Sequence, residues 1–185
     1  MDLVWAEDYE IGLIGTWCVI GFCLTSYLWM QTPDIFGRKP VILVSWFLSI
    51  LFPLLILFNT NLYLLYFYIF MFGFSTLIRG TTSYVYMLEM IPKTSEKDFL
   101  FWLTTLEQGF GLIIPISFYL TRDWRYLMFI YITISTYAWV HMWWMPESVK
   151  FYYGKRKFDK CRMVMNKISM VNTSRPFESK FQPEE

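Results

Sequence analysis

The chain has 185 residues, of which 56% are hydrophobic and 17% are charged, and its mean hydropathy is +0.37. A soluble domain of this length would carry about 25% charged residues, and residues 40–78 here carry no charge at all. This composition is hard to reconcile with a soluble fold and predicts an integral membrane protein. The formal net charge of +1 offers no basic field for nucleic acid.

No pattern typical of an enzyme is present. The sequence contains no phosphate-binding loop, no nucleophile triad and no group of residues with metal-ligand spacing. Its three cysteines are expected to be buried or free thiols. We therefore expect no catalysis, no cofactor and no bound metal ion.

Five stretches are long and apolar enough to cross a bilayer, which takes about 20 residues of helix. We predict an all-α membrane protein whose bundle lies within residues 1–146. Its five transmembrane helices are expected near residues 11–31, 41–58, 62–91, 101–120 and 126–145. The third stretch is long for one span, and its glycines would let a neighbouring helix approach closely.

The charged loops predict the orientation. Arg38 and Lys39 lie between the first two spans, and Lys93 and Lys97 lie between the third and the fourth. The N-terminus is acidic, whereas the segment after the last span is strongly basic. Because cytoplasmic loops carry an excess of lysine and arginine, the N-terminus is expected outside and the C-terminus inside. This orientation requires an odd number of spans, which five supplies.

Residues 147–171, after the last span, are predicted to form a cytoplasmic helical segment. Four apolar residues recur with the period of an amphipathic helix, namely Phe158, Cys161, Met165 and Ile168. Such a helix is expected on the inner leaflet or against the cytoplasmic ends of the bundle. Residues 172–185 are polar and contain two prolines, so we expect a flexible tail.

Two charged residues lie inside predicted spans, where charge is costly and indicates a function or a partner. Arg79 lies ten residues before Glu89 in the third span, and Glu107 lies six residues into the fourth. We predict that Arg79 and Glu107 form a buried pair between neighbouring helices. A functional pair would bind a substrate or a proton. A structural pair, which we favour, would lock two helices together or contact another subunit.

Six short motifs follow one another in the order found in a known family. They are Met1-Asp2-Leu3-Val4, Asp34-Ile-Phe-Gly37-Arg38-Lys39-Pro40, the set Gly73, Tyr84 and Glu89, Asp123-Trp124-Arg125-Tyr126-Leu127, Pro146-Glu147-Ser148 and Gly154–Val171. Each is weak alone, because short motifs match by chance. Together they resemble the first half of a major facilitator transporter of the organic cation/anion type, a solute carrier family.

This resemblance implies that the five spans are helices 2 to 6 of an incomplete N-terminal bundle, and that helix 1 and helices 7 to 12 are absent. It also implies which residues are structurally important. The loop between helices 2 and 3 contributes Asp34, Gly37, Arg38 and Lys39; helix 4 contributes Gly73 and Glu89; the turn that closes helix 6 contributes Pro146, Glu147 and Ser148. The family's binding site lies between two such halves, at the bilayer midplane.

The chain departs from the family pattern at three positions. Met30 stands where the loop motif begins with glycine, Ile35 where a basic residue follows the aspartate, and Ile69 where helix 4 carries arginine. In the family, the glycine permits close helix contact and the basic groups pair across the interface that switches. Their loss puts alternating access in doubt.

Two functional hypotheses follow, and we favour the first. The chain is a degenerate transporter half that serves as a structural or accessory subunit of a larger membrane complex, with other membrane proteins as partners. Alternatively, it is part of a split transporter for small organic ions, assembled with chains that supply the missing helices. A fragment of a longer protein is a third possibility, against which the initial methionine weighs mildly. The family implies the plasma membrane, whereas a complex subunit would also fit an organelle, including the mitochondrial inner membrane.

Overall fold

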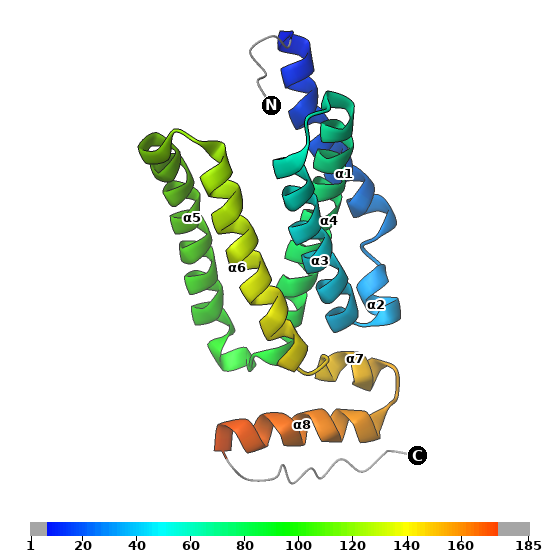
Figure 1. Ribbon diagram of the computed structural model, residues 1–185. Coiled ribbons are helices and arrows are strands. Elements are labelled where there is room, and N and C mark those ends of the chain that lie inside the picture. The colour runs from blue at the N-terminus through cyan, green and yellow to red at the C-terminus, as the bar shows by residue number, and fades with distance from the viewer. Residues whose placement is uncertain (1–6, 174–185) are drawn as a thin grey trace.

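The computed structural model describes residues 7–173, in which helices joined by short turns are the regular structure and no strand occurs (Figure 1). The motif at residues 1–4 and most of the expected tail lie outside this range. The elements in chain order are α1 (Asp8–Leu28), α2 (Thr32–Phe36), α3 (Arg38–Phe58), α4 (Leu62–Met90), η2 (Lys93–Ser95), α5 (Glu96–Thr121), α6 (Trp124–Trp144), α7 (Val149–Gly154) and α8 (Phe158–Thr173).

Four segments of the described chain are long and apolar enough to span a bilayer: α1, α3, α4 and the continuous stretch of η2 and α5. The fifth predicted span, α6, has 21 residues, as α1 and α3 have. Its tryptophan, tyrosine, serine and threonine residues lower its hydropathy, and it does not meet the same criterion. The all-helical membrane fold is therefore confirmed at the coarse level, while the count of five spans stays a prediction.

The first two long helices begin earlier than the sequence predicts. Glu10 accepts a hydrogen bond from the backbone N–H of Glu7 at 3.2 Å, which fixes the start of α1 at Asp8. The chain then turns at residues 29–31 into the short helix α2, whose first turn contains Pro33. Proline lacks an N–H and suits the first turn of a new helix better than the interior of α1.

The N-termini of α4 and α6 are capped by side chains. Asn61 accepts a hydrogen bond from Tyr63 N at 2.9 Å at the start of α4, and Asp123 accepts one from Arg125 N at 3.0 Å at the start of α6. Both caps satisfy N–H groups that a helix leaves open at its first turn. The turn before α6 also contains Arg122 in the left-handed region, with φ of 52°.

The bundle is built around the neighbouring helices α3 and α4. α1 packs against α4, and α6 packs against α3, while α5 packs mainly against α6 and η2 (Figure 1). The start of α1 lies at one end of the bundle, and α7 and α8 lie at the other (Figure 1). α8 runs across the bundle at the end where α7 lies. The cytoplasmic position expected for residues 147–171 stays a prediction.

α1 and α4 approach each other closely because glycine faces backbone at two points of the contact. A Cβ atom added at Gly21 would overlap the backbone of Phe70 and Phe74, and one added at Gly73 would overlap the backbone of Cys18. Small residues at such positions are typical of helix contacts in membranes, where packing replaces the hydrophobic effect between helices.

Buried hydroxyl groups also join the central helices. Thr25 Oγ1 donates to the carbonyl oxygen of Phe74 at 2.9 Å and links α1 to α4. Ser49 Oγ donates to Ser75 Oγ at 3.2 Å and links α3 to α4. In a membrane these interhelical hydrogen bonds contribute to association, so the three central helices form the best-connected part of the bundle.

The apolar face of α8 lies partly against α7. Cys161 is buried and its Sγ lies 3.9 Å from the carbonyl oxygen of Val149, while Met165 and Ile168 on the same face are half-buried. Cys161, Met165 and Ile168 of the predicted amphipathic stripe are therefore on the more buried side of α8, and Cys161 faces α7. Met163 lies on the opposite side of α8 and is exposed.

Because Cys161 is buried, its thiol is expected to react slowly with alkylating reagents. Burial raises the pKa of the Cys161 thiol above its ordinary value, so less of the reactive thiolate is present near pH 7.5. With Cys18 and Cys23 replaced by serine, maleimide is expected to react at Cys161 about tenfold more slowly than at a cysteine introduced by Met163→Cys in a Cys161→Ser background. The rate at Cys161 should rise as the pH approaches the raised pKa. Equal rates at both positions would contradict this packing of α8.

Candidate functional site

The loop motif, Glu89 and the Pro146-Glu147-Ser148 turn meet at one end of the bundle, around the turn between α2 and α3. Gly73 lies elsewhere, in the contact of α4 with α1. Gly37 separates α2 from α3 and has φ of 107°, a conformation that residues with a side chain rarely adopt. A Cβ atom added there would lie 2.7 Å from Glu147 Oε2. Glycine is thus required both for the backbone angle and for the approach of the glutamate.

Arg38 occupies the centre of this group, and its side chain is only 13% exposed. Its Nη2 lies 2.7 Å from Asp34 Oδ1 and 3.2 Å from Glu89 Oε1, and its Nη1 donates to the carbonyl oxygen of Pro33 at 3.0 Å. The Glu89 side chain is 10% exposed, whereas the Asp34 side chain is 69% exposed. The Arg38–Glu89 pair is therefore the buried ionic contact, and it joins the start of α3 to the end of α4.

Glu147 caps α3 from a distant part of the chain. Its Oε1 accepts hydrogen bonds from the backbone N–H groups of Arg38 at 3.0 Å and Lys39 at 3.1 Å. It also accepts one from Ser148 N at 3.0 Å. The first N–H groups of a helix have no partner within the helix, and a negative charge there is favourable. Glu147 therefore provides hydrogen-bond acceptors for the first N–H groups of α3 and attaches the start of α3 to the segment that follows α6.

The Pro146-Glu147-Ser148 turn is bound to α4 as well. Ser148 Oγ donates a hydrogen bond to Glu89 Oε2, and Tyr86 Oη donates one to the carbonyl oxygen of Pro146. Tyr86 lies three residues before Glu89 and thus on the same face of α4. That spacing could have identified Tyr86, which the sequence analysis missed.

Together, Asp34, Arg38, Glu89, Glu147 and Ser148 form what we call the Arg38 cluster. It connects the ends of α2, α3, α4 and the segment after α6. Lys39 adds a further contact, because its Nζ donates to the carbonyl oxygen of Trp143 at 2.9 Å. These contacts fix helix ends relative to one another. Within residues 7–173, no group of three or more potential ligands is placed to hold a metal ion.

The predicted pair of Arg79 and Glu107 is not formed in the structure. The Arg79 guanidinium lies 4.4 Å from the centre of the Trp46 ring and 5.9 Å from that of Tyr131, and its buried Nε has no hydrogen-bond partner. No ion pair joins Arg79 to Glu107, which is exposed on α5. The prediction assumed that a short loop makes α4 and α5 direct neighbours, but α5 packs mainly on α6.

Trp46 is accordingly expected to stabilise the half-buried Arg79 cation. Trp46→Leu should lower the free energy of unfolding in mixed micelles by about 2 kcal/mol, the size of a desolvated cation–π contact. The matched change Trp102→Leu, at a 62% exposed position on α5, should have a much smaller effect. A double-mutant cycle with Arg79→Met separates this contact from general packing. A coupling energy near zero would show that Arg79 gains nothing from the ring.

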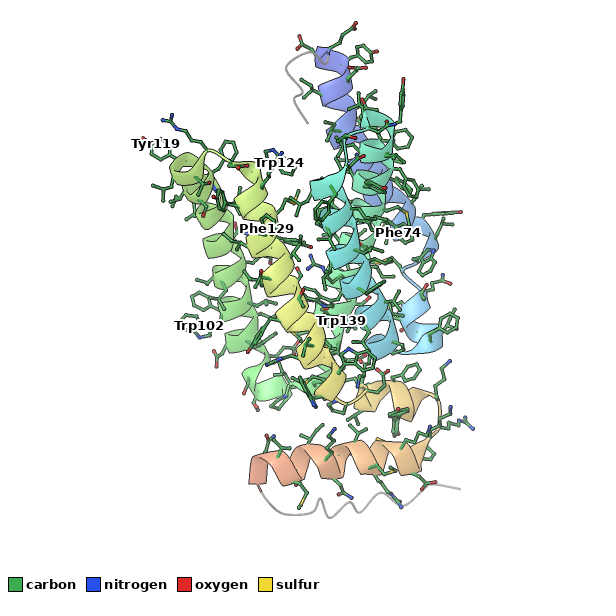
Figure 2. All side chains as sticks on the ribbon, in the orientation of Figure 1. Phe74, Trp102, Tyr119, Trp124, Phe129 and Trp139 are labelled. Atoms are coloured by element: carbon green, nitrogen blue, oxygen red, sulfur yellow. The ribbon has the colours of Figure 1, made fainter. Side chains whose placement is uncertain are left out.

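The aromatic side chains differ in placement between the two sides of the molecule. Figure 2 shows Trp102 and Tyr119 on the outer side of α5, where they are 62% and 79% exposed. Trp139 on α6 instead lies near α3, and its Nε1 donates to the carbonyl oxygen of Leu43 at 3.0 Å (Figure 2). α6 is thus tied to the central helices, while α5 presents an open apolar surface.

These features define an α-helical membrane bundle whose helix ends are joined by a charged loop cluster. The sequence profile of the Major Facilitator Superfamily matches residues 3–181, so the chain belongs to this family, as its motifs indicate.

Several organic cation transporters are similar to this chain. It is 25% identical over 173 residues to the human organic cation/carnitine transporter 2 and covers 31% of that protein. It is 24% identical over 175 residues to mouse solute carrier family 22 member 4 and covers 31% of it. It is 25% identical over 173 residues to a Drosophila melanogaster organic cation transporter-like protein and covers 30% of it. The aligned region covers 92% of this chain for the human protein, 93% for the mouse protein and 92% for the Drosophila protein. The chain thus spans about a third of the length of these curated relatives.

Proposed function

We propose that this chain is a transporter-related structural or accessory subunit of a larger membrane complex. One contrast carries the proposal. The residues of the Arg38 cluster, which tie helix ends together, are all present and in contact. The positions that would serve switching are apolar: Met30 contacts Thr81 through its sulfur, and the Ile35 side chain is 59% exposed. The contacts that hold helix ends together are thus retained, whereas the glycine and the basic residues that the family uses for switching are not.

The open surface of α5 supports an assembled state. Among the residues of η2 and α5 whose side chains the structure describes, none in the most apolar 18-residue stretch is buried. Such a surface is covered by lipid, by other membrane proteins, or by both. The proposed partners are therefore the lipid bilayer and further membrane subunits.

Native purification from the source membrane in mild detergent tests the proposal. A stoichiometric complex with proteins unrelated to transporters, of fixed mass over repeated purification, is the expected result. Recovery of the chain alone, or only with chains resembling the second half of a transporter, would contradict it.

A split transporter for small organic ions is the second candidate. It is favoured by the intact Arg38 cluster and by two of the relatives, whose names are those of an organic cation/carnitine transporter and an organic cation transporter-like protein. The test is uptake of radiolabelled tetramethylammonium into vesicles holding the purified native assembly. The variant Met30→Gly, Ile35→Arg, Ile69→Arg restores the family residues. Uptake by the native assembly, or uptake that appears only in the restored variant, would replace the scaffold proposal.

We also propose five spans, with α6 as the last, the N-terminus outside and α7 and α8 inside. The basic residues of the 147–171 segment support this orientation. In cysteine-free protein, Thr60→Cys should react with an impermeant maleimide in intact cells, and Lys155→Cys only after permeabilisation. For a protein in an internal membrane, sealed organelles replace cells. A tagged chain seen at the plasma membrane or in the mitochondrial inner membrane decides between the two proposed locations.

A further inference from the structure

Glu107 lies far from both ends of a helix that crosses the membrane. It is the twelfth of the 26 residues of α5, so a rise of 1.5 Å per residue places it about 16 Å from the start of the helix. Its side chain is exposed and makes no hydrogen bond or ion pair within residues 7–173. An ionisable group at such a depth normally has a partner, and the part of the chain that the structure describes does not supply one.

The surface around Glu107 is shaped for another helix. Thr104 and Gly111 precede and follow Glu107 by three and four residues, so all three lie along one stripe of α5. A Cβ atom added at Gly111 would meet nothing within 4 Å. An open groove of about 700 Å³ adjoins this stripe at Thr104; residues of α5 line it, among them Gln108 and Gly109, while Glu107 and Gly111 do not. Small residues allow a second backbone to come close enough for a side chain to reach the carboxylate.

The chain's own intramembrane cation is not available to this surface. Arg79 lies against Trp46 and Tyr131, on α3 and α6. A second copy packed through the same stripe would bring two Glu107 carboxylates together, which is unfavourable. The missing partner must therefore come from a different helix and must carry the opposite charge.

We infer that the stripe of Thr104, Glu107 and Gly111 on α5 receives a transmembrane helix from outside these 185 residues, and that this helix carries a lysine or arginine at mid-bilayer depth. The inference depends only on α5 being embedded in the membrane. It holds for the scaffold and for the split transporter, so its failure leaves the choice between them open.

The test uses the full chain in phosphatidylcholine vesicles and synthetic helices as defined probes. Each probe is a Leu-Ala helix of about 22 residues with uncharged polar ends and a central lysine, leucine or glutamate. Association is measured by energy transfer from a donor on the N-terminus of the chain to an acceptor on the probe. The lysine probe is expected to bind about tenfold more tightly than the leucine probe, the scale of one interhelical polar contact. The glutamate probe should bind least.

Two variants assign the preference to its residue. Glu107→Gln should bind the lysine and leucine probes within about twofold of each other, while Glu96→Gln, at the start of the same helix, should keep the wild-type preference. Circular dichroism and thermal unfolding of each variant confirm that it is folded. Equal binding of both probes by the wild type, or a preference that survives in Glu107→Gln, would overturn the inference. Self-association that occludes α5 and excludes every probe would also overturn it, in favour of a second copy.

Discussion

Arg38→Ala is expected to lower the free energy of unfolding by about 3–4 kcal/mol, the largest single-residue effect at the charged end of the bundle. The change leaves Glu89, which is 10% exposed, without its cation, and breaking a buried pair from one side is strongly destabilising. It also removes the hydrogen bond to Pro33 and the contact with Asp34. The measurement is reversible unfolding in mixed micelles titrated with SDS and followed by circular dichroism.

The neighbouring lysine provides the matched control. Lys39→Ala removes an equally charged side chain whose hydrogen bond to the carbonyl oxygen of Trp143 is exposed, so a loss below about 1 kcal/mol is expected. The double variant Arg38→Met, Glu89→Gln should be less destabilised than the sum of its single changes, because neither partner is then left charged and alone. If Arg38→Ala and Lys39→Ala lose similar stability, the cluster does not hold the helix ends.

Gly73→Ala should separate α1 from α4 and cost about 2–3 kcal/mol, within the range for overpacking a tight contact. The added methyl group would overlap the backbone of Cys18, and a backbone cannot turn aside as a flexible side chain can. Loss of the close approach would also weaken the Thr25 hydrogen bond to Phe74. Unfolding in mixed micelles measures the loss, and energy transfer between labels on the two helices reports their separation.

Gly80, seven residues further along the same helix, is the control for the substitution itself. A Cβ atom there meets nothing within 4 Å, so Gly80→Ala should be neutral or stabilising by up to about 1 kcal/mol through helix propensity. An equal and unfavourable response at both glycines would mean that helix flexibility, and not the α1–α4 contact, is what Gly73 provides.

The class of fold was predictable because the uncharged stretches have the length of membrane-spanning helices, about 20 residues, and are too long for single spanning strands. The motif residues around Asp34, Arg38 and Glu89 were predictable only through resemblance to a family. Their spacing along the chain does not state that one carboxylate, Glu147, accepts hydrogen bonds from the start of a helix more than a hundred residues away.

The error over Arg79 has a different origin. The sequence gives the charges and the loop length, and a short loop favours neighbouring helices. It does not give the rotation of each helix or the helix that packs between. In the structure the Arg79 guanidinium packs on the ring of Trp46, and α5 packs on α6. Aromatic residues are so common in this chain that no single one could be chosen as the partner from the sequence.

The start of α3 can be capped only late in synthesis of the chain, because the capping residue is Glu147. Glu147 follows Arg38 by 109 residues, so at about 5–20 residues per second the ribosome adds it roughly 5–20 seconds later. Until then the first N–H groups of α3 depend on water or lipid headgroups at the membrane surface. The second long helix of the chain can therefore enter the bilayer early, but its end is fixed only when the last long helix has been made. This end of the bundle is therefore completed only after residue 147 has been made.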